Sequence, residues 1–468
     1  MLQCIPNSIY NCIWYVILVL NSRQNWLYKI RIGVKQMRQT KKLLCLVLFT
    51  LVSTMSVSCG SDNPYISDAR NSKITHTETT TISLMTSWGG VDSKAGCLMD
   101  LLDKFENENP TIKVSNQSIF GDEYLPTLKT RFASGNEPDV FGLWPCSDIK
   151  YMIRANKLAD LTDMLRKDSE WMQSFKGNYF DLTTYNNRIF GIPFELVFEG
   201  MFINKDLFQQ YGVKIPQNYE ELKNAINIFN KHNITPIAYN ASAEGSYIYQ
   251  NMIASLGGNQ GVEKYIVNNK INRCYIDAMK YMKELFEMHA FPNDLISITS
   301  EERNNLFIKK QAAMIVQGSW FAAYFGKFDK TVEMIPFPAM GNGSSKIPAG
   351  LGGGTFYISK SAWSTPEGKE NTVKLLKFLT SKDTSDYLYK ESGLFSTLNI
   401  SMETPYNALA KQSISVYEKT PEQDRCAIPD HVIDRSTWEK VIIKEFPNYL
   451  DNKISAEEIW EKALNKLQ

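Results

Sequence analysis

The sequence predicts an α/β fold with two lobes, and three observations lead to this expectation. The chain has 468 residues, which is more than the roughly 250–300 residues at which a single hydrophobic core stops growing. Strand-like and helix-like segments alternate after residue 80, a rhythm typical of a sheet covered by helices. The third observation is a very apolar segment at residues 191–208, which suits a buried connection between the lobes. We expect this segment to carry the chain from one lobe to the other.

Composition and charge exclude several classes of partner. Hydrophobic residues make up 43% of the chain and charged residues 22%, as in an ordinary globular domain. The formal net charge of +1 provides no general attraction for nucleic acid or for an anionic membrane surface. Aromatic residues, at 12%, are frequent enough to supply stacking surfaces for a ligand as well as core side chains.

The N-terminal region contains the pattern of an export signal that begins at Met37. Basic residues precede an apolar run at residues 43–52, and small residues follow up to Cys59; this order is typical of a secretory signal peptide. Cys59 resembles the lipidated cysteine of bacterial lipoproteins, although Ser56 stands where those proteins usually have Leu. Lipidation is favoured over simple cleavage or a retained helix.

We therefore divide the N-terminal region into three expected parts. Residues 1–36 do not fit an export signal, and we expect them to be an extension upstream of the true start; a genuine anchor there is the alternative. Residues 37–58 are the expected signal peptide. Residues 59–80 are polar, cannot bury a core and are expected to form a flexible tether.

The first expected lobe follows the order strand, helix, strand, helix, strand. The strands are expected at residues 81–85, 112–114 and 138–141. The intervening helices show apolar residues on one face, namely Leu98, Leu101, Leu102 and Phe105 in the first and Leu125, Leu128 and Phe132 in the second.

The apolar segment at residues 191–208 is expected to be extended chain buried on both sides. Its β-branched and aromatic content favours a strand, and Pro193 argues against a helix interior. Only Glu195 and Glu199 interrupt the apolar run. A buried carboxylate costs several kcal/mol unless it is paired, so both need partners or a wet cleft.

Seven phrases occur in one order along the chain: F-E-N-E-N-P-T-I-K-V, F-A-S-G-N-E-P-D-V, G-I-P-F-E, F-I-N-K-D-L-F, K-K-Q-A-A-M-I-V-Q-G-S-W, G-G-G-T-F-Y-I-S-K and K-L-L-K-F-L-T-S-K. Together they resemble the extracellular solute-binding proteins of carbohydrate ABC transporters, the group that includes maltose-binding protein. The resemblance extends from Thr81 to the C-terminus. At Gly393–Ser396 the chain departs from it, because relatives often have Pro after this Gly.

The resemblance implies a fold, a function and partners. The implied fold is the periplasmic-binding-protein-like one, with a mainly parallel sheet flanked by helices in each lobe and a chain that crosses the hinge more than once. The implied function is capture of a sugar or oligosaccharide by hinge closure, followed by delivery to the permease subunits of an ABC transporter. No cofactor, no catalysis and a monomer are expected, on the extracytoplasmic face of the cell membrane through a lipid anchor only.

The expected lobe boundaries follow from the same reasoning. Lobe 1 is assigned residues 81–193 and 311–350, and lobe 2 residues 194–310 and 351–468. The strand at residues 312–316 is thus expected in lobe 1 and the strand at residues 356–358 in lobe 2. The loop Gly350–Gly354 precedes a strand and not a helix, so it suits a hinge better than a dinucleotide site.

Three tryptophans are the main candidates for ligand contact. Each follows an expected strand of lobe 1, and in open α/β sheets that edge binds ligands. A sugar ring stacks its C–H face on an indole while polar groups hold its hydroxyls. The three are Trp88, Trp144 and Trp320. The competing interpretation is that each side chain packs in the core, and this alternative has most weight for Trp88.

The remaining candidates are weaker. Tyr247 and Phe356 offer further aromatic faces, and Asp92 either accepts a hydroxyl hydrogen bond or caps its helix. Glu195 is weighed as a ligand contact against a structural salt bridge and is favoured as a contact, whereas for Glu199 the two are even. Four cysteines are expected as isolated buried thiols more than as disulfides, namely Cys97, Cys146, Cys274 and Cys426.

Catalytic and metal motifs are missing from the sequence. It contains no H-E-x-x-H, no G-x-S-x-G and no phosphate-binding loop, and its four His are widely spaced. On a continuous strand Glu195 and Glu199 would be about 13 Å apart, whereas glycosidase pairs are separated by about 5.5 or about 6.5–9.5 Å. Two alternatives stay open: a receptor for a non-sugar solute (a peptide, a polyamine or an iron complex) and, less favoured, an exported glycosidase.

Overall fold

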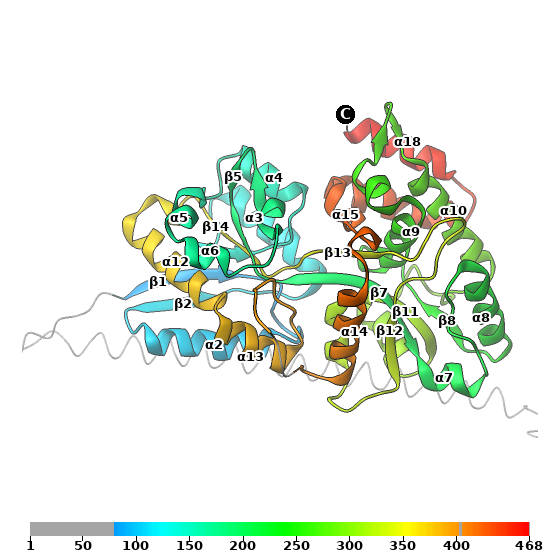
Figure 1. Cartoon of the computed structure of the whole chain (residues 1–468). Coiled ribbons are helices and arrows are strands. Elements are labelled where there is room, and N and C mark those ends of the chain that lie inside the picture. Colours follow the sequence, from blue (N-terminus) through cyan, green and yellow to red (C-terminus); the bar gives the residue numbers. More distant parts are fainter. Residues whose placement is uncertain (1–78, 402–404, 468) are drawn as a thin grey trace, which may run out of the picture. The chain divides into compact units, whose positions relative to one another are not determined.

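The computed structural model describes residues 79–401 and 405–467, shown in Figure 1. The expectations for the export signal, for Cys59 and for most of the tether fall before residue 79, outside the described residues. The described chain contains two large β-sheets, each with its own helices and hydrophobic cores. We call each sheet with its helices a lobe, and the expected two-lobed α/β fold is confirmed.

The sheet of lobe 1 has the strand order β2-β1-β3-β14-β6. Its strands are β1 (Thr80–Met85), β2 (Ile112–Asn116), β3 (Val140–Gly142), β6 (Gly191–Pro193) and β14 (Thr355–Ile358). The helices of this lobe are α2 (Ala95–Glu108), α3 (Tyr124–Ser134), α4 (Ser147–Arg154), α5 (Thr162–Lys167), α6 (Ser169–Gln173), α12 (Pro366–Leu379) and α13 (Lys382–Ser392). A small hairpin adds β4 (Thr184–Tyr185) and β5 (Arg188–Ile189).

Alternation along the strands explains why helices cover both faces of this sheet. Val140, Phe356 and Ile358 belong to the core that also contains α2, α12 and α13. Phe141 and Tyr357 point to the opposite face and join the side chains of α3 and α4, because successive residues of a strand face opposite sides. These two rings are cross-strand partners and stack with centroids 5.3 Å apart.

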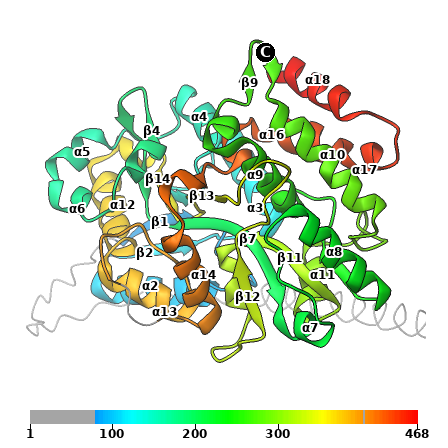
Figure 2. The same cartoon turned by 45° about the vertical axis from the view of Figure 1, so that its right-hand side comes forward.

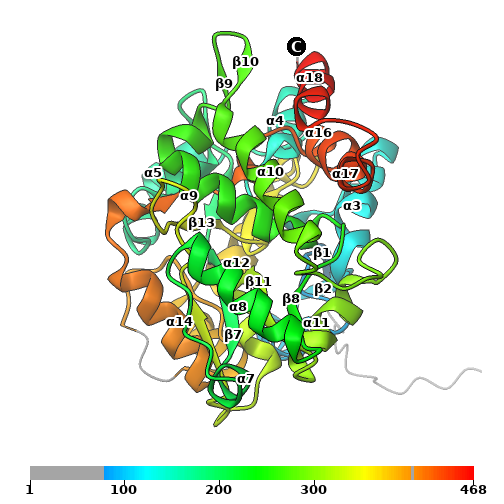
Figure 3. The ribbon, with the colours of Figure 1, turned by 90° about the vertical axis from the view of Figure 1, so that its right-hand side faces the viewer.

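The sheet of lobe 2 has the order β15-β13-β7-β11-β8, and β12 also pairs with β7. Its strands are β7 (Leu196–Asn204), β8 (Thr235–Ala238), β11 (Ala312–Gly318), β12 (Val332–Ile335), β13 (Ile347–Leu351) and β15 (Arg425–Cys426). Figure 3 shows α8, α9 and α10 in front of this sheet. All nine residues of β7 are buried, as expected for the apolar segment.

The helices of lobe 2 come from parts of the sequence before and after the last crossing of the chain from lobe 1 to lobe 2. Those before it are α7 (Lys205–Gln210), α8 (Tyr219–Lys231), α9 (Tyr247–Glu263), α10 (Arg273–Glu287) and α11 (Ser300–Ile308). Those after it are α14 (Ala408–Lys419), α15 (Pro429–Val432), α16 (Arg435–Thr437), α17 (Lys444–Leu450) and α18 (Ala456–Leu467). The hairpin of β9 (Ile266–Val267) and β10 (Lys270–Ile271) and the π-helical turn Trp438–Ile443 complete the lobe.

Three expectations about the sheets are wrong. The strand at residues 312–316 lies in lobe 2, because β11 pairs with β7 over five residues, and β13 pairs with β7 as well. The strand at residues 356–358 lies in lobe 1, where β14 pairs with β3 and β6. An apolar strand fits the core of either lobe, so composition alone could not assign it. Both sheets are also mixed and not mainly parallel, since β14 runs against β3 and β7 runs against three neighbours.

Two further findings concern membranes and cysteines. Within the described ranges, no helix is long and apolar enough to cross a membrane. Cys97, Cys146, Cys274 and Cys426 are all buried and unpaired, which confirms the expectation of isolated thiols.

Candidate ligand site at the lobe interface

The chain crosses between the lobes at three places that lie side by side. The β6–β7, β13–β14 and α13–α14 connections make these crossings, and Figure 2 shows β7 and β13 running next to each other. The amide of Leu196 donates to the carbonyl of Phe395 at 2.8 Å, and that of Thr397 donates to Phe194 at 2.9 Å. The amide of Gly352 donates to the carbonyl of Glu195 at 2.9 Å. Hydrogen bonds thus hold the three crossings together as one hinge.

Glu195 is a structural residue of this hinge. Its side chain is buried, its Oε2 accepts the N–H of Gly354 at 2.7 Å, and its Oε1 lies 3.7 Å from Nζ of Lys94. Burial raises the pKa of Glu195, while Lys94 and the Gly354 N–H counteract this rise. In this conformation Glu195 therefore takes the salt-bridge alternative and not the ligand contact that we favoured. Sequence reasoning missed Lys94, because the pairing joins segments about one hundred residues apart in the chain.

Close packing, and not unusual backbone angles, accounts for the glycines at this hinge. In the described chain, none of Gly350, Gly352, Gly353 and Gly354 is among the glycines with positive φ. A Cβ on Gly354 would lie 2.6 Å from the Trp88 ring, and one on Gly352 would lie 2.6 Å from a Glu195 oxygen. The loop lies at the hinge as expected, but its glycines are explained by close packing and not by unusual backbone angles.

Trp88 and Phe356 belong to the core beside the hinge. Trp88 is 1% exposed and Phe356 is fully buried. Their rings pack edge to face with centroids 5.7 Å apart. For both residues the structure supports the core interpretation.

Trp144 lies where the two lobes touch. It follows β3 and is half-buried, and the guanidinium carbon of Arg435 from lobe 2 is 5.5 Å from its ring centre. The amide of Arg435 donates to Oγ of Ser147 at 2.9 Å, and the hydroxyl of Tyr151 donates to Oδ2 of Asp434 at 2.9 Å. We call these four polar residues, Ser147, Tyr151, Asp434 and Arg435, the inter-lobe latch.

Lobe 2 contributes its own aromatic pair. Tyr247 begins α9, and Trp320 lies in the 3₁₀ turn Ser319–Tyr324 directly after β11. Both side chains are half-buried, and their rings meet edge to face with centroids 5.6 Å apart. The expectation that Trp320 follows a strand end is therefore correct, although the strand belongs to lobe 2.

Glu199 lies behind this aromatic pair. The alternation of β7 turns it toward α9, where Nδ2 of Asn251 donates both to Glu199 at 2.9 Å and to the carbonyl of Tyr247 at 2.9 Å. Burial raises the pKa of Glu199 well above its ordinary range, and the charge of Asp430 raises it further. The two carboxylates of the apolar segment thus occupy different environments.

Asp92 and Tyr324 connect the two sides. Oδ1 of Asp92 accepts the backbone N–H of Lys94 at 2.8 Å just before α2 and lies 3.3 Å from Nζ of Lys94. Tyr324 is 43% exposed, and its partial burial raises its pKa; Glu244 and Asp92 raise the pKa further while Lys94 opposes them. Charges from both lobes therefore act on Tyr324. Sequence reasoning missed this residue because nothing distinguishes it from its aromatic neighbours.

The structure thus gathers one set of side chains from both lobes, which we call the inter-lobe group: Asp92, Trp144, Tyr247, Trp320, Tyr324 and Arg435. Its rings can stack on an apolar face, and its charged and hydroxyl groups can accept and donate hydrogen bonds. No group of acidic, His and Cys side chains suited to a metal ion is present in the residues that the structure describes.

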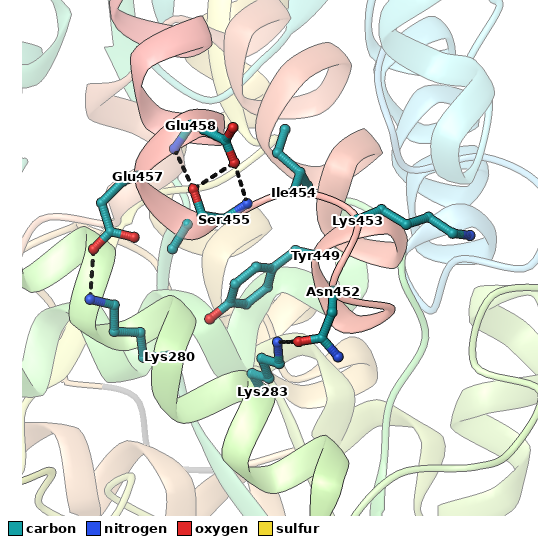
Figure 4. A pocket seen from close by; sticks show the side chains of 10 residues that line it. Lys280, Lys283, Tyr449, Asn452, Lys453, Ile454, Ser455, Glu457 and Glu458 are labelled. Atoms are coloured by element: carbon teal, nitrogen blue, oxygen red, sulfur yellow. Dashed lines mark hydrogen bonds and ion pairs between the residues drawn. The ribbon is translucent and has the colours of Figure 1, made fainter.

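A separate surface pocket of about 380 Å³ lies between α10 and the start of α18, shown in Figure 4. Its two lysines bond to other lining side chains: Lys280 is 2.7 Å from Glu457, and Lys283 donates to Asn452. Ser455 and Glu458 cap the start of α18. The residues that line it all belong to lobe 2, so it does not join the lobes as the inter-lobe group does.

Comparison with known proteins gives relatives of one kind. The "Multiple sugar-binding protein" of Streptococcus mutans is 23% identical over 377 residues, which cover 76% of this chain and 82% of that protein. The "Maltodextrin-binding protein MdxE" of Bacillus subtilis is 22% identical over 320 residues, which cover 66% of this chain and 70% of that protein.

Solved structures share the fold. One, described under "Biochemical and structural insights into xylan utilization" by the thermophilic bacterium Caldanaerobius polysaccharolyticus, has a TM-score of 0.74 and 23% identity and covers 83% of this chain and 100% of that one. A "Chitin oligosaccharide binding protein" has a TM-score of 0.72 and 20% identity and covers 82% and 98%. Residues 95–385, more than half of the sequence, match the family described as "Bacterial extracellular solute-binding protein". The chain therefore belongs to the bacterial extracellular solute-binding proteins.

Proposed function

We propose that the chain captures a sugar or an oligosaccharide between its two lobes and delivers it to the permease of an ABC transporter. The observation that carries this proposal is the inter-lobe group, in which aromatic rings and polar side chains of both lobes meet. A sugar ring needs both, because it has an apolar C–H face and a rim of hydroxyls. The names of the two relatives support the same class of ligand.

The hinge supports a mechanism of closure around the ligand. Three bonded crossings allow the lobes to rotate about one line, as in other hinged binding proteins. A ligand that contacts Trp144 on one side and Tyr247 and Trp320 on the other binds the closed form better, so it shifts the population toward that form. The permease would then recognise the closed shape of the monomer.

Attachment to the membrane is a further part of the proposal. The export pattern supports translation from Met37, removal of residues 37–58 and lipidation of Cys59 on the extracytoplasmic side. Replacing Cys59 with Ser should move the protein from the membrane fraction to the soluble fraction. A peptide from residues 1–36 in the native protein would contradict the assigned start.

Calorimetry with neutral oligosaccharides tests the ligand class. Maltotriose, cellotriose, triacetylchitotriose and raffinose form a suitable panel. For the sugar that binds best, Trp144→Ala should weaken binding by at least about 1–3 kcal/mol, because it removes a stacking surface. Trp363→Ala is the matched control, since Trp363 is also half-buried in lobe 1 but lies under Lys369.

Two results would count against the proposal. Equal affinities of the wild type and Trp144→Ala would remove Trp144 from the site, and absence of binding to any sugar would reject the ligand class. Chromatography of the incubated sugars should show them intact. Cleaved products would instead favour the glycosidase alternative.

A further inference from the structure

We infer that the inter-lobe site selects uncharged sugars and rejects sugars that carry a carboxylate. This inference rests on the proposed function and adds the charge of the ligand to it. The argument comes from the pairing of the charged side chains in and around the inter-lobe group.

Three cations of the described chain that lie in or beside the inter-lobe group, Lys94, Arg435 and Arg303, are each bound to at least one carboxylate of the protein. Nζ of Lys94 lies 3.3 Å from Asp92 and 3.7 Å from Glu195, and its side chain is only 6% exposed. Arg435 is bound to Asp430 and to Glu439, both at 2.6 Å. Two carboxylates therefore surround each of these cations.

The third cation, Arg303, is also bound to side chains of the protein. Arg303 is 1% exposed, lies 3.2 Å from Glu244 and donates its other hydrogen bonds to Asn240 and Asn304. A carboxylate on a ligand would have to displace one of these protein partners to reach any of the three cations. It would then leave that group of the protein without its partner, which is most unfavourable at the buried carboxylates Glu195 and Asp430.

Buried hydrogen-bonding atoms of both kinds lack a partner in the described part of the inter-lobe region: Nε1 of Trp144, a donor, and Oδ1 of Asn251, an acceptor. The Glu199 side chain has no ion-pair partner in the described chain, and its one side-chain hydrogen bond there comes from Asn251. The site therefore suits a ligand group that can both donate and accept a hydrogen bond.

A sugar hydroxyl and a carboxylate differ in this respect. The hydroxyl can donate to a protein acceptor and can accept as well, whereas an ionised carboxylate only accepts. The carboxylate also adds a negative charge beside Asp92, Glu244 and Asp430, and like charges across a binding site work against the wrong partner. The pairing pattern thus favours a neutral sugar over its acidic counterpart.

Calorimetry on matched sugars tests this inference with the full-length protein. The probes are maltotriose, cellotriose and raffinose, each compared at pH 7 with the form in which a primary C6 alcohol is oxidised to a carboxylate. We expect the acidic form of the best-binding sugar to bind at least tenfold more weakly. We also expect the difference to shrink as salt is added, because salt screens the repulsion.

A variant locates the effect. Asp430→Asn removes one of the two carboxylates that bind Arg435. The ratio of the affinity for the neutral sugar to the affinity for its acidic form should then fall at least threefold. Asp277→Asn is the control, because Asp277 also pairs with an arginine of lobe 2, Arg273, but on the surface at 2.9 Å; the ratio should not change. If Asp430→Asn does not fold, the salt series on the wild type keeps the test decisive.

The outcomes separate the two proposals. Equal or tighter binding of an acidic sugar overturns the inference but leaves sugar capture in place. Binding of no sugar overturns both. Spermidine serves as a cationic probe, and tighter binding of spermidine than of every neutral sugar would also overturn both, in favour of a polyamine receptor.

Discussion

Glu195 and Glu199 come from the same apolar segment, yet the structure places them in contrasting environments. Glu195 lies at the hinge, where Lys94 and the Gly354 N–H partner its side chain. Glu199 lies in lobe 2 with Asn251 as its hydrogen-bond donor and Asp430 as a neighbouring acid. A buried carboxylate can thus be stabilised by a nearby buried cation, or it can stay protonated and uncharged. Glu195 at the hinge is stabilised by a cation, whereas Glu199 in lobe 2 stays protonated.

The largest effect should come from removing the cation of the hinge. Lys94→Met leaves Asp92 and Glu195 without their shared partner, and breaking a buried ion pair typically costs about 3–5 kcal/mol. Urea unfolding of the variant should show this loss of stability. In the double variant Lys94→Met/Glu195→Gln much of it should return, because the stranded charge is gone. A neutral effect of Lys94→Met would mean that the hinge does not depend on this pair.

A smaller effect should come from filling the space that the hinge keeps open. Gly354→Ala places a Cβ 2.6 Å from the Trp88 ring and 2.8 Å from Glu195, and overpacking of this kind costs about 1–3 kcal/mol. Gly326→Ala is the control, because its Cβ would meet nothing within 4 Å. Similar melting temperatures for the two variants would contradict the packing argument.

The sequence predicted the crossing well and its partners poorly. Residues 191–208 could be recognised as a buried crossing because their pattern is local, and β6 and β7 do lie in different sheets. Lys94 and Arg435 could not be recognised, since the contacts that bring them to the hinge and to the other lobe, with Glu195 and with Trp144, join distant parts of the chain. The lobe of β11 was wrong for the same reason: strand pairing is a long-range property that an apolar run does not encode.

The same limit applies to the candidate ligand residues. Trp144, Trp320 and Asp92 were found because a residue that follows a strand reaches the sheet edge, and Tyr247 was found as an aromatic residue in an expected loop of lobe 2. The structure brings these four into the inter-lobe group, and their contact with a ligand stays a prediction. Trp88 satisfies the same rule but is buried, because Phe356 and Gly354 close over its ring. The rule finds positions and cannot tell which of them other segments cover.

The pH dependence of stability should distinguish Glu199 from an ordinary surface acid. Because burial raises the pKa of Glu199, the folded protein holds a proton there that the unfolded chain releases near its ordinary pKa of about 4.3. The unfolded state therefore binds fewer protons in this window, and stability falls as pH rises through it. Glu199→Gln cannot ionise, so its stability relative to the wild type should increase from pH 5 to pH 8.5 in urea unfolding.

A matched variant controls for the loss of one acid elsewhere. Glu220 is 81% exposed on α8, and Glu220→Gln should not reproduce this trend. A constant difference between Glu199→Gln and the wild type across the pH range would show that Glu199 ionises like a surface acid.

The smallest effect should come from the inter-lobe latch, which joins the lobes through side chains apart from the three chain crossings. Tyr151→Phe removes the hydrogen bond to Asp434 and leaves the ring in place, so we expect a loss of about 1 kcal/mol from the contact between the lobes. Tyr387→Phe removes a similar bond to Asp100 at 2.7 Å, but within lobe 1. Energy transfer between dyes on Asp163→Cys in lobe 1 and Lys309→Cys in lobe 2 should report a wider separation for Tyr151→Phe only. If both tyrosine variants match the parent protein, the latch does not contribute to closure and the hinge alone sets the position of the lobes.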